Sequence, residues 1–459
     1  MFKKSSNYKK VLLVCLIIFS TLFFSSCSSS LDAFDGDSVM VFKNVNVIPM
    51  NTERVLKNYN VIINDGKIVK LGKAWKTRVP KNATVIDGKG KFLTPGLIDM
   101  HVHIWLDDEL ELYLANGVTG VRDMFGNFGR LSMKKKIQEG KILGPRLYVA
   151  SPIIDGDPPY WDGSTVITNP DDAEKYVKSY KEMGYDFIKI YEGLTNDVYD
   201  AIIEAAKKED IPVVGHIPSS VGIEKALQAG QKSIEHLDKY TDSEDLYNMT
   251  IDNNVWNCPT IVLYTNRILP LLGEKVAGIE YVDPRSVSIW GVRMGLPRGS
   301  AEEYVKSNQY IADSLPQESI ESYVERVKSI IEESKTVTKN LYDRGGRILL
   351  GTDTNNPFIV PGFSIHDELF NLVEAGLTPY EAIKAGTYDA AEFLNILEEA
   401  GTVEENKNAD LVLLDGNPLD DIANMKKIEG VMLMGRWISK SEIDDMLNSR
   451  LEEYGRKAN

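Results

Sequence analysis

Alternating strand-like and helix-like segments fill the middle of this sequence and restrict its fold more than any other feature. From about Phe92 to Ile396, short apolar runs alternate with amphipathic helical stretches, and clear consecutive units read DFIKIYE, NDVYDAIIEAAKKED, PVVGHIP, GIEKALQAG and KSIEHL. Strands that alternate with helices pair in parallel, and about 300 residues at this spacing suit a closed eight-stranded barrel better than an open sheet. We therefore predict an α/β fold with a (β/α)8 TIM barrel over 92–399. An acidic, helical region over 299–339 interrupts the alternation and is expected to form an excursion over the barrel mouth.

Both ends of the chain read instead as short strands separated by turns. The segment 38–91 contains VMVFKNVNVI and NVIINDGKIVKLG, in which Asn-Asp-Gly at 64–66 is typical of a hairpin turn. A similar pattern returns near the other end, in ADLVLLDGNP and GVMLMGRWIS. We predict that 38–91 and 400–445 pair into one small β-sandwich domain, followed by a C-terminal helical tail over 446–459.

The first 27 residues have the pattern of an export signal. An apolar run over 11–24 ends at Ser25-Ser26-Cys27, and four basic residues precede it: Lys3, Lys4, Lys9 and Lys10. We predict a lipoprotein signal peptide over 1–27, lipidation at Cys27, and a serine-rich tether over 28–37. The protein would then be exported and lipid-anchored to a bacterial membrane, on the periplasmic or cell-surface side. The alternative is an ordinary cleaved signal that leaves Cys27 as a free thiol, and it also implies export.

Net charge limits the partners of the protein, and cysteine content limits its disulfide bonds. The chain has 52 Lys and Arg against 67 Asp and Glu, a formal net charge of −15. Such an acidic surface repels phosphate backbones, so we expect no nucleic-acid partner. The three cysteines are Cys15, Cys27 and Cys258, and the first lies in the predicted signal. No disulfide framework is therefore expected.

Four of the five histidines stand at or near the ends of predicted strands: His101, His103, His216 and His236. One such histidine alone is more often structural than a ligand, but four at strand ends favour a metal site, because the carboxyl ends of barrel strands converge. Alternate residues of a strand face the same way, so His101 and His103 aim two imidazoles at one place. Asp353 adds a carboxylate after the last apolar strand.

Lys189 lies inside the strand-like DFIKIYE, where an unmodified lysine would bury a charge unless it were paired. An ion pair with Glu192 or Asp186 is one explanation. Modification of the amine is the other.

The motifs PGLIDMHVHIW, FIKIY, VVGHIP, SIEHLD, GTDTN and HDELFNLVEAGLTPYEAIKAGTYDAAEFL, in this order, resemble the binuclear amidohydrolases related to imidazolonepropionase and the Xaa-Pro and Xaa-Arg dipeptidases. The resemblance covers nearly everything from Val39 to Ser439. It implies two divalent metal ions, expected to be zinc. The ligands that it implies are His101, His103 and Asp353 for the first ion, His216 and His236 for the second, and Lys189, carboxylated to a carbamate, as the bridge between them.

The resemblance also implies a reaction. A metal-bridging hydroxide would attack an amide carbonyl, with Asp353 as the proton shuttle to the leaving amine. The expected substrate is a small molecule or peptide, most simply a dipeptide or an acyl-amino acid.

Further side chains are candidates for weaker roles. Tyr191, two residues beyond Lys189, faces the same side of its strand and is a candidate substrate contact, with packing as the alternative. His366, at the beginning of a helix, is a second candidate, with a structural role as the alternative. Arg122 and Asp123 are expected to form a structural ion pair.

Two other functions stay open. A mononuclear deaminase of the same superfamily would need a glutamate shortly after His216, where Ile217-Pro218-Ser219 stands instead, and a cyclic amide or lactone hydrolase would share the site. A non-catalytic envelope binding lipoprotein is the reading from another class. All six implied ligands are present, which favours the hydrolase.

Cys27→Ala tests the lipid anchor. Lipid attachment requires the thiol, so the variant should leave the membrane fraction or fail to mature. Fractionation and mass spectrometry of the exported protein measure both effects, and an unchanged mass with unchanged membrane association would contradict the anchor.

Overall fold

The computed structural model describes residues 39–293 and 317–455. The predicted signal peptide, the tether and Cys27 therefore lie outside the described residues, as does the first part of the predicted excursion. Within the described ranges, no helix is long and apolar enough to cross a membrane.

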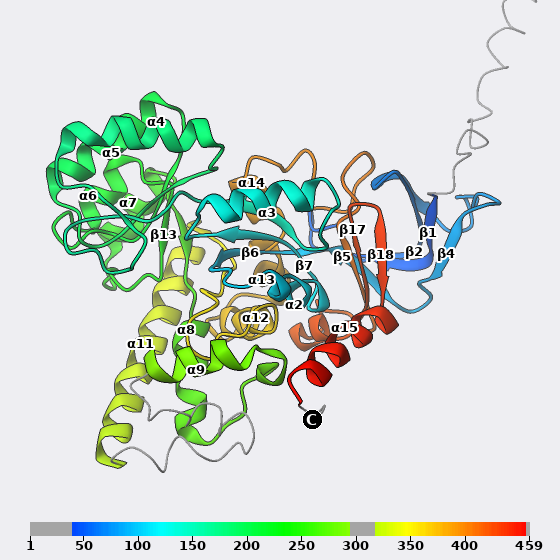
Figure 1. The fold of residues 1–459 in the computed structure, drawn as a ribbon. Helices are drawn as coiled ribbons and strands as arrows, with labels where there is room; N and C mark the ends of the chain where they lie inside the picture. The colour runs from blue at the N-terminus through cyan, green and yellow to red at the C-terminus, as the bar shows by residue number, and fades with distance from the viewer. Residues whose placement is uncertain (1–38, 294–316, 456–459) are drawn as a thin grey trace, which may run out of the picture.

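Strands from both ends of the chain form one eight-stranded sheet, in the order β18-β17-β16-β5-β1-β2-β3 with β4 also paired to β1 (Figure 1). The strands are β1 Met40–Val47, β2 Leu56–Asn64, β3 Lys67–Lys73, β4 Thr84–Asp87, β5 Phe92–Pro95, β16 Leu411–Leu414, β17 Ile428–Leu433 and β18 Arg436–Ser439. The predicted union of the two ends is confirmed. The sheet also includes β5, which the sequence analysis had assigned to the beginning of the barrel.

The alternation of side chains along a strand explains how this sheet joins the β-domain to the barrel. Leu411 and Leu413 of β16 point into the core of the β-domain, whereas Val412 and Leu414 belong to the large hydrophobic cluster of the barrel. Successive side chains of a strand point to opposite faces, so one strand serves both cores. The predicted hairpin turn is also present, because β2 and β3 are joined by two residues with positive φ, Asp65 at 49° and Gly66 at 72°.

In the part of the chain that the structure describes, eight parallel strands close a barrel, three from one sheet and five from another. They are β6 Leu97–Val102, β7 Val118–Asp123, β8 Arg146–Val149, β11 Ile188–Ile190, β12 Val213–Gly215, β13 Ser233–Glu235, β14 Trp256–Cys258 and β15 Arg347–Ile348. Parallel bridges Ala150↔Phe187 and Val102↔Thr354 join the two sheets. Two short strands extend the second sheet outside the barrel: β9 Ile154–Asp155 pairs with β11, and β10 Thr165–Val166 pairs with β9. The predicted TIM barrel is confirmed.

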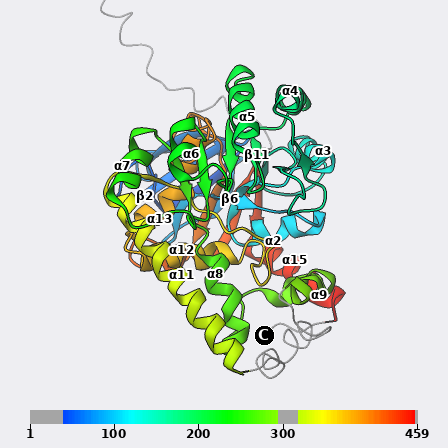
Figure 2. The same cartoon turned by 90° about the vertical axis from the view of Figure 1, so that its left-hand side faces the viewer.

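The helices surround these strands, as Figure 2 shows. They are α2 Leu110–Ala115, α3 Phe128–Gln138, α4 Ala173–Met183, α5 Asn196–Lys208, α6 Ile223–Ala229, α7 Glu244–Asp252, α8 Val262–Ile268, α9 Pro284–Arg293, α11 Gln317–Asp343, α12 Ser364–Glu374, α13 Pro379–Ala385, α14 Tyr388–Phe393 and α15 Lys440–Glu453. In α5, Val198, Ile202 and Ala205 recur at helical spacing and are buried, so its apolar stripe faces the barrel.

A second hydrophobic cluster lies beside the carboxyl ends of the last strands. Val287 and Trp290 of α9 pack there with Val324 of α11 and with Phe358 from the segment after β15. The described part of the predicted excursion, from residue 317, is thus one long helix, α11. Its first half belongs to this layer of helices next to the barrel mouth.

The predicted tail is a docked helix that begins earlier, at Lys440. Arg450 of α15 is 4% exposed, and its guanidinium donates to the carbonyl oxygens of Tyr281 at 3.0 Å and Asp108 at 2.7 Å. Helix α15 therefore ties the C-terminal part of the chain to the barrel.

Candidate active site

Six side chains predicted from the sequence meet at the carboxyl ends of the barrel strands. They are His101 and His103 at β6, Lys189 in β11, His216 after β12, His236 after β13, and Asp353 after β15. The ring centroids of His101 and His236 are 4.9 Å apart, and those of His216 and His236 are 4.7 Å apart. Nε2 of His103 lies 3.0 Å from Oδ1 of Asp353. Lys189 lines the same cavity as His103, His216, His236 and Asp353 and so belongs to this cluster.

Local backbone conformation aims these side chains. His236 and Asp353 both have left-handed backbones, with φ of 72° and 59°, which costs non-glycine residues free energy and is typical of functional sites. Gly215, just before His216, has φ of 128°, and a Cβ there would collide with the carbonyl oxygen of Ile190. Only glycine lets β12 pass so close to β11.

Burial favours the neutral form of three of the imidazoles. It lowers the pKa of His101 and of His216 well below the usual range and lowers that of His236 in the same direction. A neutral imidazole can offer a nitrogen lone pair to a metal. Burial alone would raise the pKa of Asp353, but His101, His236 and His103 outweigh this effect and hold the pKa well below its usual range.

Lys189 is buried without a carboxylate partner. Its side chain is 1% exposed, and its Nζ has no hydrogen-bond partner within the described ranges. Asp186 instead binds Lys134 at 2.6 Å, and Glu192 lies 3.3 Å from Nδ1 of His216. The ion pair considered for Lys189 from the sequence is therefore wrong. Burial lowers the pKa of Lys189 to about 8, so a neutral amine is accessible near neutral pH.

The donor set fits a divalent metal ion. Ligand atoms of His101, His103 and Asp353 lie within 4.8 Å of one another. Nε2 of His101 is buried without a hydrogen-bond partner among the described residues, which is a cost that metal coordination would remove. Imidazole nitrogen and carboxylate oxygen are ligands that zinc prefers.

Glu235 is a site residue that the sequence analysis missed. It is 1% exposed, its Oε2 lies 2.9 Å from Nδ1 of His101, and its carboxylate accepts from Arg122 Nη2 at 2.9 and 3.0 Å. It thus fixes the orientation of His101 from behind. The expected pairing of Arg122 with Asp123 is wrong, because neighbouring residues of a strand face opposite sides. Asp123 lies instead 3.5 Å from Nε of Arg130.

A cavity of about 540 Å³ opens above the cluster. Its lining includes His103, Lys189, His216, His236 and Asp353, together with Trp105, Phe125, Ile153, Tyr160, Trp161, Asp162, Tyr191, Glu192, Asp238, Leu263, Tyr264, Arg267, Asn355 and Asn356. Tyr191 stands in the wall as expected, with its ring centroid 4.1 Å from that of His216. His366 is buried on α12 and is not among the lining residues, so its location does not support a substrate contact.

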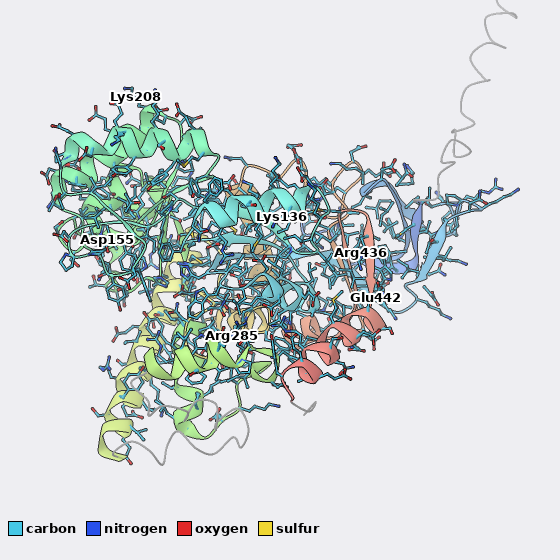
Figure 3. All side chains as sticks on the ribbon, viewed as in Figure 1. Lys136, Asp155, Lys208, Arg285, Arg436 and Glu442 are labelled. Carbon is cyan, nitrogen blue, oxygen red and sulfur yellow. The ribbon has the colours of Figure 1, made fainter. Side chains whose placement is uncertain are left out.

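The aromatic part of the wall is held by Asp155, labelled in Figure 3. Oδ1 of Asp155 accepts from the backbone N–H of Gly193 at 2.8 Å, and Oδ2 accepts from that of Tyr160 at 2.9 Å. The buried carboxylate thereby fixes the loop that carries Tyr160 and Trp161. These residues lie on a loop outside the strand pattern, so the sequence offered no signal for them.

A closed β/α barrel with a histidine-rich group at its carboxyl end defines the class of protein, and comparison identifies the family. A model of the amidohydrolase family matches residues 92–438, more than half of the chain. The chain belongs to the amidohydrolase family and is a hydrolase acting on carbon–nitrogen bonds.

Individual relatives are distant. Ochratoxinase of Aspergillus niger is 26% identical over 437 residues, covering 80% of this chain and 79% of that protein. An adenine deaminase of Clostridium botulinum is 20% identical, covering 90% of this chain but 59% of that protein. Bottromycin amidohydrolase superposes with a TM-score of 0.74 at 24% identity, covering 92% of each chain. A putative prolidase from Bifidobacterium longum superposes with a TM-score of 0.69 at 22% sequence identity, covering 90% of this chain and 99% of that one.

Arg122→Met should destabilise the protein strongly. The variant leaves the Glu235 carboxylate buried without its cation, which costs about 3–5 kcal/mol in the free energy of unfolding. Adding Glu235→Gln should recover much of the loss, because the uncompensated charge is gone. Urea unfolding of metal-depleted protein measures both variants. A single variant as stable as the parent, or a double variant no better than the single one, would show that the charge pair is unimportant.

Proposed function

We propose that this protein hydrolyses the amide bond of a dipeptide or an acyl-amino acid, using two divalent metal ions, with zinc expected. The observation that carries the proposal is the cluster of imidazoles around Asp353 and the unpaired amine of Lys189, at the floor of a cavity of substrate size. In this proposal His101, His103 and Asp353 would hold one ion, His216 and His236 would hold the other, and Lys189, as a carbamate, would contribute a ligand to both.

The bound ions would activate water at neutral pH and polarise the scissile carbonyl. Asp353 is the residue of the chain that moves the proton. Its Oδ2 accepts from Nδ2 of Asn356 at 2.7 Å, which fixes the carboxylate while Oδ1 faces His101 and His103. Asp353 accepts the proton of the attacking water and delivers it to the nitrogen of the leaving amine. Tyr191, in the wall beside His216, orients the substrate.

Carboxylation would explain why a lysine stands at the buried position 189. A buried cation without a partner is costly, whereas a carbamate is an anion that two metal ions stabilise. The lowered pKa supplies the neutral amine that reacts with carbon dioxide.

A mononuclear deaminase is the second candidate, and the similarity to adenine deaminase favours considering it. The acid closest to His216 that the structure offers is Glu192, which also lies 3.4 Å from Lys239. No acid follows His216 directly in the sequence.

A substrate panel combined with metal analysis separates the candidates. Purified, zinc-loaded protein is screened against dipeptides, acyl-amino acids, cyclic amides, lactones and adenine. About two ions per chain with amide hydrolysis supports the proposal, and one ion with ammonia release supports the deaminase. No bound metal and no turnover supports a binding lipoprotein.

Export and attachment through Cys27 complete the proposal and place the activity outside the cytoplasm.

Lys189→Ala should lose the bridge, bind less than two ions per chain and be inactive. In the parent protein, reconstitution of the metal-depleted chain in buffer free of carbon dioxide should restore activity slowly, and bicarbonate should accelerate it. ¹³C-labelled bicarbonate should give a carbamate signal by NMR in the parent and not in the variant. Lys225→Ala, at an exposed ion pair with Asp200, is the matched control. Two ions and parental turnover in Lys189→Ala would reject the binuclear mechanism.

Asp353→Asn should lower kcat by about 10²- to 10⁴-fold, the usual contribution of a positioned acid/base, with a much smaller change in KM. Metal content is measured in the same preparations, so that lost turnover is not confused with lost metal. A metal-replete variant with near-parental kcat would remove Asp353 from proton transfer.

A further inference from the structure

One stretch of the β-domain is basic and free of acids, in contrast to the acidic chain around it. Residues 67–86, here called the basic segment, contain no Asp or Glu, although the net charge of the whole chain is −15. Six exposed cations lie in this segment: Lys67, Lys70, Lys73, Lys76, Arg78 and Lys81. Among the described residues only Lys70 has an ion-pair partner, Glu405 at 3.1 Å. Most of the positive charge is therefore not compensated by the protein.

Trp75 lies in the middle of the basic segment, on a turn that hydrogen bonds fix in place. Its side chain is 78% exposed. The backbone N–H groups of Lys76 and Thr77 both donate to the carbonyl oxygen of Lys73 at 2.9 Å. Nδ2 of the buried Asn60 donates to the carbonyl oxygen of Thr77 at 2.8 Å, and Nζ of Lys76 lies 4.6 Å from the centroid of the Trp75 ring. An ordered indole left in water has a cost in free energy that an apolar environment would remove.

The described chain begins against the basic segment. Val79 packs against the hydrophobic cluster that contains Val39, and the backbone N–H of Thr84 donates to the carbonyl oxygen of Val39 at 2.9 Å. Val85 of β4, 49% exposed, adds a second apolar side chain here. Figure 1 shows β4 at the opposite end of the molecule from α4 and α5. Val39 is twelve residues from Cys27, at most about 40 Å of extended chain, so an anchor at Cys27 would keep the basic segment near the membrane.

Cations around an exposed indole match the chemistry of an anionic bilayer surface. Lipid phosphates attract Lys and Arg, and Trp prefers the interface, where its ring lies among the headgroups and its N–H keeps a hydrogen-bond partner. A soluble polyanion would bind the cations but would offer Val85 no apolar environment.

We propose that the basic segment docks the β-domain on the headgroups of anionic phospholipids, with Trp75 inserted at the interface. The inference is independent of amide hydrolysis. It also goes beyond a lipid on Cys27, because a lipid alone tethers the protein in any orientation. A docked basic segment fixes the β-domain against the membrane and holds the barrel on the far side of it.

Vesicle binding by protein without a lipid tests this surface alone. The chain from residue 27 with Cys27→Ala contains every described residue and cannot be acylated. It should sediment with vesicles of phosphatidylcholine and phosphatidylglycerol, and not with vesicles of phosphatidylcholine alone. Added salt should release it, because salt screens exposed charges. Failure to bind the anionic vesicles overturns the proposal.

Neutralising cations beside Trp75 tests whether the basic segment is the contact. The variant carries three substitutions: Lys76→Gln, Arg78→Gln and Lys81→Gln. It should bind anionic vesicles about 100-fold more weakly, since each cation near such a surface contributes about fivefold. A matched control neutralises three exposed cations of α4 and α5, at the other end of the molecule (Figure 3): Lys175→Gln, Lys178→Gln and Lys208→Gln. The control should bind like the parent. Equal losses in the two variants, with thermal unfolding unchanged, overturn the proposal.

Trp75 distinguishes a bilayer from a polyanion. When the anionic vesicles contain brominated phosphatidylcholine, binding should quench tryptophan fluorescence of the parent, because bromine quenches an indole that enters the bilayer. Trp75→Ala should lose this quenching and bind about tenfold more weakly. Phe128→Ala, at an 81% exposed aromatic side chain of α3, is the matched control and should keep both. Binding of the parent without quenching would show that the cations bind anions at the surface only, and it overturns docking on the bilayer.

Discussion

Closure of the barrel between β6 and the segment after β15 is the constraint on which the site depends. The backbone N–H of Met100 donates to Leu350 at 2.9 Å, and that of Asp353 donates to His101 at 2.8 Å. These bonds join parts of the chain about 250 residues apart and bring Asp353 against His101 and His103. Without closure, the histidines of β6 would lose the carboxylate of Asp353, which lies 3.0 Å from Nε2 of His103 and 3.3 Å from Nε2 of His101.

A buried acid reinforces this closure from within. Asp99 is fully buried, and its carboxylate accepts from the backbone N–H of Thr352 at 3.0 Å, from its hydroxyl at 2.7 Å and from the N–H of His101 at 3.2 Å. Burial raises the pKa of Asp99 to about 7 despite these bonds. Glu235 plays the corresponding part on the other side of His101. Asp99 thus fixes the backbone of His101 and Glu235 fixes its imidazole, which together give the rigidity that a metal ligand needs.

The sequence predicted residues whose position follows from strand pattern alone. The four histidines, Lys189 and Asp353 stand at readable strand ends, and a barrel makes such ends converge. The contacts that the sequence analysis missed depend on which strands become neighbours and on the direction of side chains across the barrel. Arg122 and Glu235 are 113 residues apart, and no local pattern pairs them. Glu235 did carry a signal, since it is a charge inside an apolar strand, the same feature that drew attention to Lys189.

The charges of the cavity divide into those compensated by the protein and those that are not. Lys239 lies between Glu192 and Asp238, and Arg122 compensates Glu235, so these acids do not repel an anionic substrate strongly. Asp162 is exposed, and solvent and salt screen it. Arg267 and Lys189 are left as the wall's uncompensated basic groups among the described residues. Carboxylation would make Lys189 an anion committed to the metal ions, and Arg267 would then remain as the uncompensated cation of the wall. On a chain with a net charge of −15, such a local cation makes the cavity wall more favourable to an anionic ligand than the rest of the surface.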